Sequence, residues 1–204
     1  MSILLIRHGE TAGNTNRVVQ VPETPLSERG LAQAALLGKR LANAGISQIL
    51  ASDYARAAMT AESLSAATGI AVDSEPLLRE RNFGDHRGCR YEDLDVDLFD
   101  PGYAPPGGED WETFHARVDL AWGAIGRAAA RAGGDLAVVT HGLVLYSLTL
   151  RHLMPAGDDE PAMGFANTSL TVVEAVAPWR VELLNCSTHL DESTANDRKS
   201  ISGI

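Results

Sequence analysis

Two short stretches of the sequence each carry a histidine followed by a glycine at the end of an apolar run. Residues 3–6 (ILLI) lead into Arg-His-Gly at 7–9, and residues 136–139 (LAVV) lead into Thr-His-Gly at 140–142. Apolar runs of this length, bounded by polar residues, are typical of buried strands. A neutral imidazole is a nucleophile near neutral pH, and a guanidinium offers a rigid fork of donors to an anion with several oxygens. Together these residue types favour chemistry on a phosphoryl group.

An arginine from a third place in the chain extends this cluster. Residues 48–51 (QILA) form another apolar run, and Arg56 lies about one helical turn beyond it. If the three runs are parallel strands, their carboxyl ends meet at one edge of the sheet, where Arg56 joins Arg7 and the two histidines. Two guanidiniums suit a dianion. Neighbouring cations also disfavour the protonated form of His8, which keeps its imidazole nucleophilic.

Glu80 is the candidate proton donor for a leaving group. It lies in residues 76–109, a long segment with little periodicity and many Gly, Pro and Asp residues. Long irregular segments in compact domains are usually functional. A single histidine at a strand end is more often a structural hydrogen-bonding group, but two strand-end His-Gly pairs favour a site. The spacing of His, Asp and Glu resembles no metal site, so we expect none.

Periodicity predicts the elements that must position these residues. Strands are expected at 3–6, 48–51, 70–72, 136–139, 169–175 and 180–184, and helices at 27–44, 52–66, 110–132 and 143–153. Such alternation predicts a mostly parallel sheet with helices on both faces, whose ligands bind beyond the carboxyl ends of the strands. We expect one domain over residues 1–191 and a polar tail over 192–204.

Composition limits the partners of the chain. With a formal net charge of -10 over 204 residues, the protein lacks the basic footprint of a nucleic-acid binder. Its first apolar run is too short for a signal sequence, and no stretch approaches a membrane span. Cys89 and Cys186 lie far apart and suit a reducing compartment. We therefore expect a cytoplasmic protein without nucleic-acid or membrane partners. The oligomeric state has no signature in the sequence.

Five motifs, taken in order, resemble those of the histidine phosphatase superfamily, the phosphoglycerate-mutase-like family. They are RHGETAGN (7–14), SDYARAAMTAE (52–62), LLRERNFGDHRG (77–88), PPGGED (105–110) and VVTHG (138–142). The resemblance extends over about residues 3–190. It implies a three-layer α/β/α sandwich around a mainly parallel sheet with an antiparallel edge strand. It also implies phosphoryl transfer through a phosphohistidine, without a metal or an organic cofactor.

The resemblance assigns roles to individual positions. His8 matches the nucleophile, and Glu80 matches the general acid that afterwards activates water. The other matching positions contact the phosphoryl group: the arginines Arg7 and Arg56, the second histidine His141, the asparagine Asn14 and the backbone amide of Gly142. These roles agree with the separation into nucleophile, cations and acid that the residue types favour.

Departures from the family pattern bear on the type of reaction. Gly13 stands where many relatives carry tryptophan, and residues 81–88 lack the Tyr-Gly-x-Leu-x-Gly-Leu-Asn-Lys-like run of glycolytic mutases. The chain is also shorter than typical cofactor-dependent mutases. We therefore favour a phosphatase over a mutase. A non-catalytic phosphoryl-ligand binder is a further alternative, but the presence of both His8 and Glu80 argues against it.

The sequence indicates the class of the substrate but not its identity. We expect a small phosphorylated metabolite, namely a sugar phosphate, a phosphoglycerate-type acid or a nucleoside-type phosphate. A phosphoprotein fits less well, because residues 82–109 are expected to cover part of the site. Four arginines, Arg79, Arg81, Arg87 and Arg90, are dense beside Glu80. They are either solvated surface or, where they face the pocket, contacts for a second anionic group.

Overall fold

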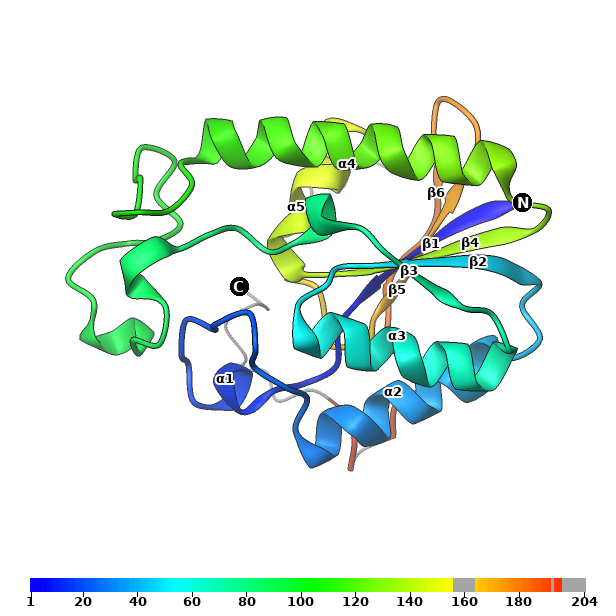
Figure 1. Ribbon diagram of the computed structural model, residues 1–204, viewed down its shortest axis with the longest axis horizontal. Helices are drawn as coiled ribbons and strands as arrows, with labels where there is room; N and C mark the ends of the chain where they lie inside the picture. The colour runs from blue at the N-terminus through cyan, green and yellow to red at the C-terminus, as the bar shows by residue number, and fades with distance from the viewer. Residues whose placement is uncertain (156–163, 192, 196–204) are drawn as a thin grey trace.

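The computed structural model describes residues 1–155, 164–191 and 193–195, which form a six-stranded sheet between two layers of helices (Figure 1). The strands are β1 (Ser2–Arg7), β2 (Ile46–Ala51), β3 (Val72–Ser74), β4 (Asp135–Thr140), β5 (Leu170–Glu174) and β6 (Val181–Cys186). The α-helices are α1 (Ala12–Thr15), α2 (Glu28–Leu41), α3 (Ala55–Thr68), α4 (Trp111–Arg131) and α5 (Gly142–Arg151). The fold is the expected three-layer α/β/α arrangement.

The strand order is β3-β2-β4-β1-β5-β6, so the two strands that end in His-Gly pairs lie side by side at its centre. The pairs β2–β3, β2–β4 and β1–β4 are parallel, whereas β5 is antiparallel to both of its neighbours. The expected antiparallel strand is therefore β5. It lies one position inside the edge, and β6 forms the edge itself.

Alternation along β1 divides the core between the two faces of the sheet. Ile3 and Leu5 contact the cluster under α4 and α5, whereas Leu4 and Ile6 contact the cluster under α2 and α3. All four are at most 4% exposed. Helices cover both faces (Figure 1), which is why these strands are apolar throughout instead of alternating with polar residues.

Most helix starts follow from capping chemistry. The side chains of Ser27 and Asp110 cap α2 and α4 by accepting hydrogen bonds from Gly30 N and Thr113 N, and the predicted helices begin at these two residues. The start of the helix predicted at residues 52–66 is wrong. That helix is α3, which begins at Ala55 with Tyr54 at its N-cap position, because the Ser52 hydroxyl contacts His141 instead.

The irregular segment contains three short 3-10 turns: η1 (Pro76–Leu78), η2 (Gly84–His86) and η3 (Tyr91–Asp93). The buried Arg81 holds this segment together, because its guanidinium donates to the carbonyls of Leu98, Tyr103 and Glu109. Hydrogen bonds from each nitrogen of a buried guanidinium to backbone carbonyls give a segment without regular structure a fixed shape.

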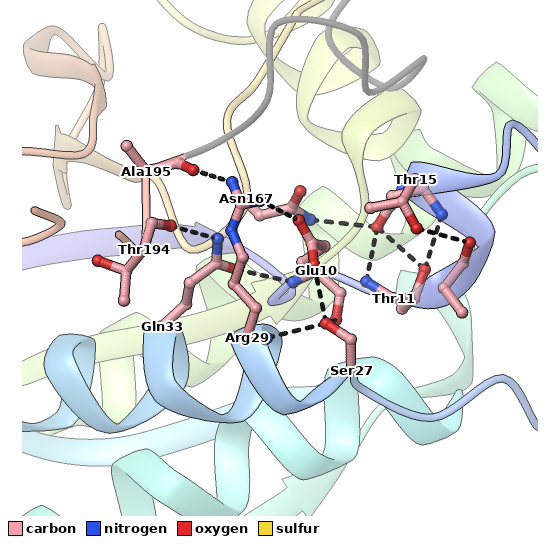
Figure 2. A network of polar contacts seen from close by, with 12 residues as sticks. Glu10, Thr11, Thr15, Ser27, Arg29, Gln33, Asn167, Thr194 and Ala195 are labelled. Atoms are coloured by element: carbon pink, nitrogen blue, oxygen red, sulfur yellow. Dashed lines mark hydrogen bonds and ion pairs between the residues drawn. The ribbon is translucent and has the colours of Figure 1, made fainter. Parts of the chain in front are cut away.

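The first described residues of the predicted tail contact the main body of the fold. Thr194 O and Ala195 O accept hydrogen bonds from Gln33 and Arg29 of α2 (Figure 2). Residues 192 and 196–204 lie outside the described residues, so most of the predicted tail carries no structural account. No helix in the described ranges has the length and apolar character needed to cross a membrane.

Candidate active site

The parallel pairing of β1 with β4 brings the two histidines together. Arg7 pairs with Thr140 in the register of the two strands, and His8 N donates to Thr140 O at 3.0 Å. The rings of His8 and His141 follow directly, with centroids 5.2 Å apart, and both residues are buried. Residues 133 positions apart in the chain thus meet at the carboxyl edge of the sheet, as the sequence predicts.

One nitrogen of the His8 ring is held by a hydrogen bond, and the other has its lone pair available for nucleophilic attack. Nδ1 lies 2.7 Å from the carbonyl oxygen of Gly9. Because a carbonyl only accepts, this contact assigns the proton of the neutral ring to Nδ1 and leaves the lone pair on Nε2. Burial, followed by the charges of Arg56 and Arg7, lowers the pKa of His8 well below its ordinary value. The ring is therefore neutral and nucleophilic near pH 7.

Two buried guanidiniums supply the positive charge of the site. Arg7 is 1% exposed and Arg56 2% exposed, and burial lowers the pKa of each to about 10. Both stay cationic at neutral pH, and both are attracted by the carboxylate of Glu80. Arg56 donates from one terminal nitrogen to Val21 O at 3.1 Å. Its Nε is buried without a hydrogen-bond partner among the described residues, which indicates a place for a polar ligand atom.

Glu80 combines a fixed position with a raised pKa. Its Oε1 accepts from Arg81 N at 3.0 Å, and its Oε2 accepts from Leu143 N at 3.2 Å. Burial raises the pKa of the Glu80 carboxyl above its ordinary value, and the two backbone hydrogen bonds oppose that shift. A carboxyl group with a raised pKa can carry a proton at a higher pH than an exposed glutamate can, which suits a general acid.

The backbone before Glu80 is anchored from two sides. The Thr140 hydroxyl donates to Leu78 O at 2.7 Å, and Arg117 donates to Arg79 O at 2.8 Å and to Glu80 O at 3.3 Å. The Thr140 side chain therefore connects the end of β4 to the segment that carries Glu80. Arg117 has no signature in the sequence, because its position in α4 looks like that of any exposed helical arginine.

Asn14 lies in the short helix α1, which is held by a reciprocal capping box with Thr11. Asn14 Oδ1 accepts from Thr11 N at 3.1 Å and from Thr11 Oγ1 at 3.0 Å, so the amide nitrogen is the end of the side chain that can donate. Gly13 lies against Gln20, and a Cβ on Gly13 would be 2.5 Å from Gln20 Cγ. The glutamine side chain thus occupies the space beside the glycine that replaces the expected tryptophan.

At the end of β4, His141 and Gly142 have neighbours that the sequence does not predict. His141 Nε2 lies 2.8 Å from Ser52 Oγ, and His141 Nδ1 is buried without a hydrogen-bond partner among the described residues. Burial, followed by the charge of Arg56, lowers the pKa of His141 well below its ordinary value. Gly142 is the first residue of α5, where amides lack an intrahelical acceptor. It is the next amide, on Leu143, that contacts Glu80.

Gly9 has a different role from Gly142. Its amide donates to Thr60 Oγ1 at 3.0 Å, and a Cβ at this position would lie 2.7 Å from Gly30 O. The absence of a side chain therefore allows the loop after β1 to approach α2 closely. The strand-end glycine is required here by packing of the backbone against a helix.

Glu80 lines two cavities. The inner cavity, of about 50 Å³, is lined by His8, Asn14, Gln20, Arg56, Glu80 and Tyr91, among others. The outer cavity, of about 730 Å³, is lined by Tyr54, Arg79, Glu80, Arg87, Glu109 and Arg117, among others. Gln20 and Tyr91 have no signature in the sequence, because one lies in a loop and the other in the irregular segment.

The four arginines of residues 79–90 separate into two groups. Arg79 and Arg87 line the outer cavity. Arg81 is buried by its carbonyl contacts, and Arg90 is exposed and pairs with Glu92. The arrangement as a whole offers a neutral imidazole, a fixed guanidinium and a carboxyl group around one small cavity, through His8, Arg56 and Glu80. This arrangement is suited to the transfer of a phosphoryl group.

Comparison with known proteins agrees with this geometry. The sequence model of the histidine phosphatase superfamily (branch 1) matches residues 3–187. A probable phosphoglycerate mutase, GpmB, of Yersinia pestis (strain Pestoides F) is 29% identical over 212 aligned residues, which cover 94% of this chain and 95% of that protein.

Two solved phosphatase structures are also similar. The mycobacterial glucosyl-3-phosphoglycerate phosphatase is 27% identical, with a TM-score of 0.76 over 91% of this chain and 98% of that one. A putative α-ribazole-5'-P phosphatase of Escherichia coli K-12 is 25% identical, with a TM-score of 0.79 over 92% of this chain and 97% of that one. The relatives thus include both mutases and phosphatases.

Proposed function

Because the chain belongs to the histidine phosphatase superfamily, we propose that it is a metal-independent phosphatase that hydrolyses a small phosphomonoester through a phosphohistidine at His8. One observation carries this proposal. Glu80, whose pKa is raised, lines the same small cavity as His8, whose Nδ1 is held by a carbonyl. Nucleophile and acid are thus presented to one bound group.

In the first step, the lone pair on His8 Nε2 attacks phosphorus and forms the N–P bond. The bond from phosphorus to the ester oxygen breaks, and Glu80 gives its proton to the departing alkoxide. Arg7 and Arg56 stabilise the charge on the equatorial oxygens, together with His141, the Asn14 amide and the backbone amide of Gly142. The fixed cations supply the positive charge that a metal ion supplies in other phosphatases, which is why the proposal needs none.

In the second step, water attacks the phosphohistidine. Glu80, now a carboxylate, takes a proton from the water, the P–N bond breaks, and its electron pair returns to His8 Nε2. The products are inorganic phosphate and the regenerated pair of neutral His8 and protonated Glu80. The position of Glu80 beside the larger outer cavity supports hydrolysis, since water approaching from there meets the general base first.

Phosphoglycerate mutase is the second candidate, favoured by the similarity to the probable mutase of Yersinia pestis. A mutase must retain its dephosphorylated intermediate, whereas a phosphatase needs only to admit water.

A cytoplasmic location is part of the proposal and is supported by two cysteines that are both free. A small metabolite is the proposed partner, because Glu80 lies inside cavities instead of on an open surface.

Hydrolysis of p-nitrophenyl phosphate with excess chelator tests the proposal. We expect activity in the wild-type protein with chelator present, and its loss in His8→Ala. Activity that depends on added metal would exclude the proposed mechanism. Interconversion of 2- and 3-phosphoglycerate, measured separately from phosphate release, distinguishes the mutase.

A further inference from the structure

The outer cavity contains one arginine whose charge no carboxylate among the described residues balances. This residue is Arg87, which lines the outer cavity together with Glu80. We propose that Arg87 binds a second anionic group on the leaving-group side of the substrate, so that the enzyme acts on phosphomonoesters with another negative charge. This inference rests on the proposed function and specifies its substrate class.

The other two arginines of the cavity are already neutralised. Arg79 forms a two-pronged ion pair with Asp53, in which Arg79 Nε donates to Asp53 Oδ1 at 2.7 Å. Arg117 forms another with Glu109, through contacts of 2.7 and 2.8 Å. Two-pronged pairing engages each of these guanidiniums with a carboxylate, so both offer an incoming anion less uncompensated charge than Arg87 does.

Arg87 is held in place by a neutral partner instead. Its one side-chain hydrogen bond within the described part of the chain runs from a terminal nitrogen to the Tyr54 hydroxyl, at 2.8 Å. Its guanidinium carbon lies 6.0 Å from the centre of the Tyr54 ring. A phenol orients the guanidinium without cancelling its charge, and the remaining N–H donors of the fork stay available. The side chain is half-buried, which strengthens its attraction for an anion relative to open solvent.

Tyr54 links this arginine to the reacting centre. The guanidinium carbons of Arg56 and Arg79 lie 5.3 and 5.7 Å from the centre of the same ring, and Arg56 lines the inner cavity, whereas Tyr54 lines the outer one. Arg87 is near enough to contribute to the lowered pKa of Arg56. Glu80 lines both cavities. A leaving group that takes its proton from Glu80 can therefore extend into the outer cavity, whose wall includes Arg87.

The carboxylates around the outer cavity do not cancel this attraction. Asp53 and Glu109 are paired with arginines, and Glu80 is the proposed proton donor. Glu23 is exposed at the cavity wall, where solvent and salt screen its charge. A carboxylate or a second phosphoryl group matches the planar fork of Arg87, whereas an uncharged polyol offers only neutral acceptors.

Calorimetry with matched pairs of ligands tests this inference. The protein carries the substitution His8→Asn, so that it binds ligands but cannot form phosphohistidine. The carboxylate pair is 3-phosphoglycerate against glycerol 3-phosphate, and the phosphoryl pair is fructose 1,6-bisphosphate against fructose 6-phosphate. The measured quantity is the ratio of dissociation constants within a pair, because general damage to the phosphoryl site weakens both members alike.

We expect the more anionic member of at least one pair to bind about tenfold tighter or better, as a charge-assisted hydrogen bond provides. Arg87→Ala should remove most of that preference, and Arg87→Lys should retain part of it. Arg90→Ala is the matched control, since Arg90 is an exposed arginine nearby that pairs with Glu92, and it should leave the ratio unchanged.

Each outcome decides the inference. The absence of a preference in both pairs, or a preference that persists in Arg87→Ala, would overturn it. A response confined to one pair identifies carboxylate or phosphoryl as the anion that is recognised. Because binding is measured without turnover, failure of the phosphatase proposal is seen separately, as the absence of His8-dependent hydrolysis of p-nitrophenyl phosphate by the wild-type protein.

Discussion

At the scale of single residues, the site depends on opposite pKa shifts in two groups that share a cavity. Burial lowers the pKa of the His8 imidazole and raises that of the Glu80 carboxyl. Each shift favours the neutral form of the group, because a buried charge loses its hydration. The two shifts therefore bring the pH range in which His8 is unprotonated closer to the range in which Glu80 is protonated, which suits their proposed roles as nucleophile and acid.

The pH dependence of kcat/KM should reflect both shifts. Activity requires His8 without its extra proton, so it falls as the pH drops through the lowered pKa of His8. Activity also requires protonated Glu80, so it falls as the pH rises through the raised pKa of Glu80. We expect a bell-shaped profile in the wild-type protein and loss of the alkaline limb in Glu80→Gln, measured with one alkyl phosphate. An unchanged alkaline limb in that variant would assign it to another group.

Glu80→Gln should also separate leaving groups. An alkyl phosphate needs a proton on its leaving oxygen, so phosphorylation of His8 should slow by roughly 10² to 10⁴. p-Nitrophenolate leaves without a proton, so its pre-steady-state burst should be much less affected. Rapid-quench measurement of both bursts checks this. Equal slowing of the two would contradict the assignment of Glu80 as general acid.

At the scale of elements, the loop after β1 is fixed by a close approach to α2. Glu10 O accepts from Ser27 N, and Glu10 N donates to the side chain of Gln33 (Figure 2). Gly30 makes this approach possible, since a Cβ there would lie 2.0 Å from Glu10 O. The position of His8, two residues earlier, therefore depends on a helix that contributes no residue to the chemistry.

Gly30→Ala should both destabilise the protein and impair catalysis. The added methyl group meets backbone, which cannot rotate away, so we expect a loss of about 1–3 kcal/mol from the free energy of unfolding. Urea denaturation and p-nitrophenyl phosphate turnover measure the two effects. Gly126→Ala in α4 is the matched control: a Cβ there meets nothing within 4 Å, so the change should be neutral or slightly stabilising. Similar stability of the two variants would show that α2 does not restrain the loop.

At the scale of the whole molecule, Gln33 connects the loop after β1 with the last described residues of the chain. Its side chain is buried, accepts from Glu10 N at 2.8 Å and donates to Thr194 O at 2.8 Å (Figure 2). Arg29 repeats this connection through an ion pair with Glu10 and a hydrogen bond to Ala195 O. The start of the predicted tail is thus connected, through α2, to the loop that follows His8.

Gln33→Ala should leave a buried amide at Glu10 and a carbonyl at Thr194 without partners. Unsatisfied buried groups cost about 1–3 kcal/mol, so we expect a loss of that size in stability and faster hydrogen exchange at Glu10. Lys39→Ala, on the exposed face of the same helix, should change stability by less than about 0.5 kcal/mol. Equal effects of the two substitutions would remove Gln33 as the link.

The sequence by itself determined the fold class and the gathering of Arg7, His8 and His141. Strand ends are encoded locally by apolar runs and glycines, and parallel pairing brings the ends to one edge whatever the rest of the chain does. Glu80 was found because it lies in a long irregular segment beside matching motif residues. Local pattern also predicts helices that begin at Ser27 and Asp110, and these two side chains cap α2 and α4.

Only the tertiary structure decided which neighbouring side chains act together. The sequence predicts a helix that begins at Ser52, yet the Ser52 hydroxyl contacts His141, and Gly9 makes room for α2. The four arginines near Glu80 look alike in the sequence, but their surroundings differ. Carbonyls saturate Arg81, carboxylates pair with Arg79 and Arg90, and a phenol holds Arg87. The charge that a side chain offers to a ligand depends on its partners, and those partners come from distant parts of the chain that only folding brings together.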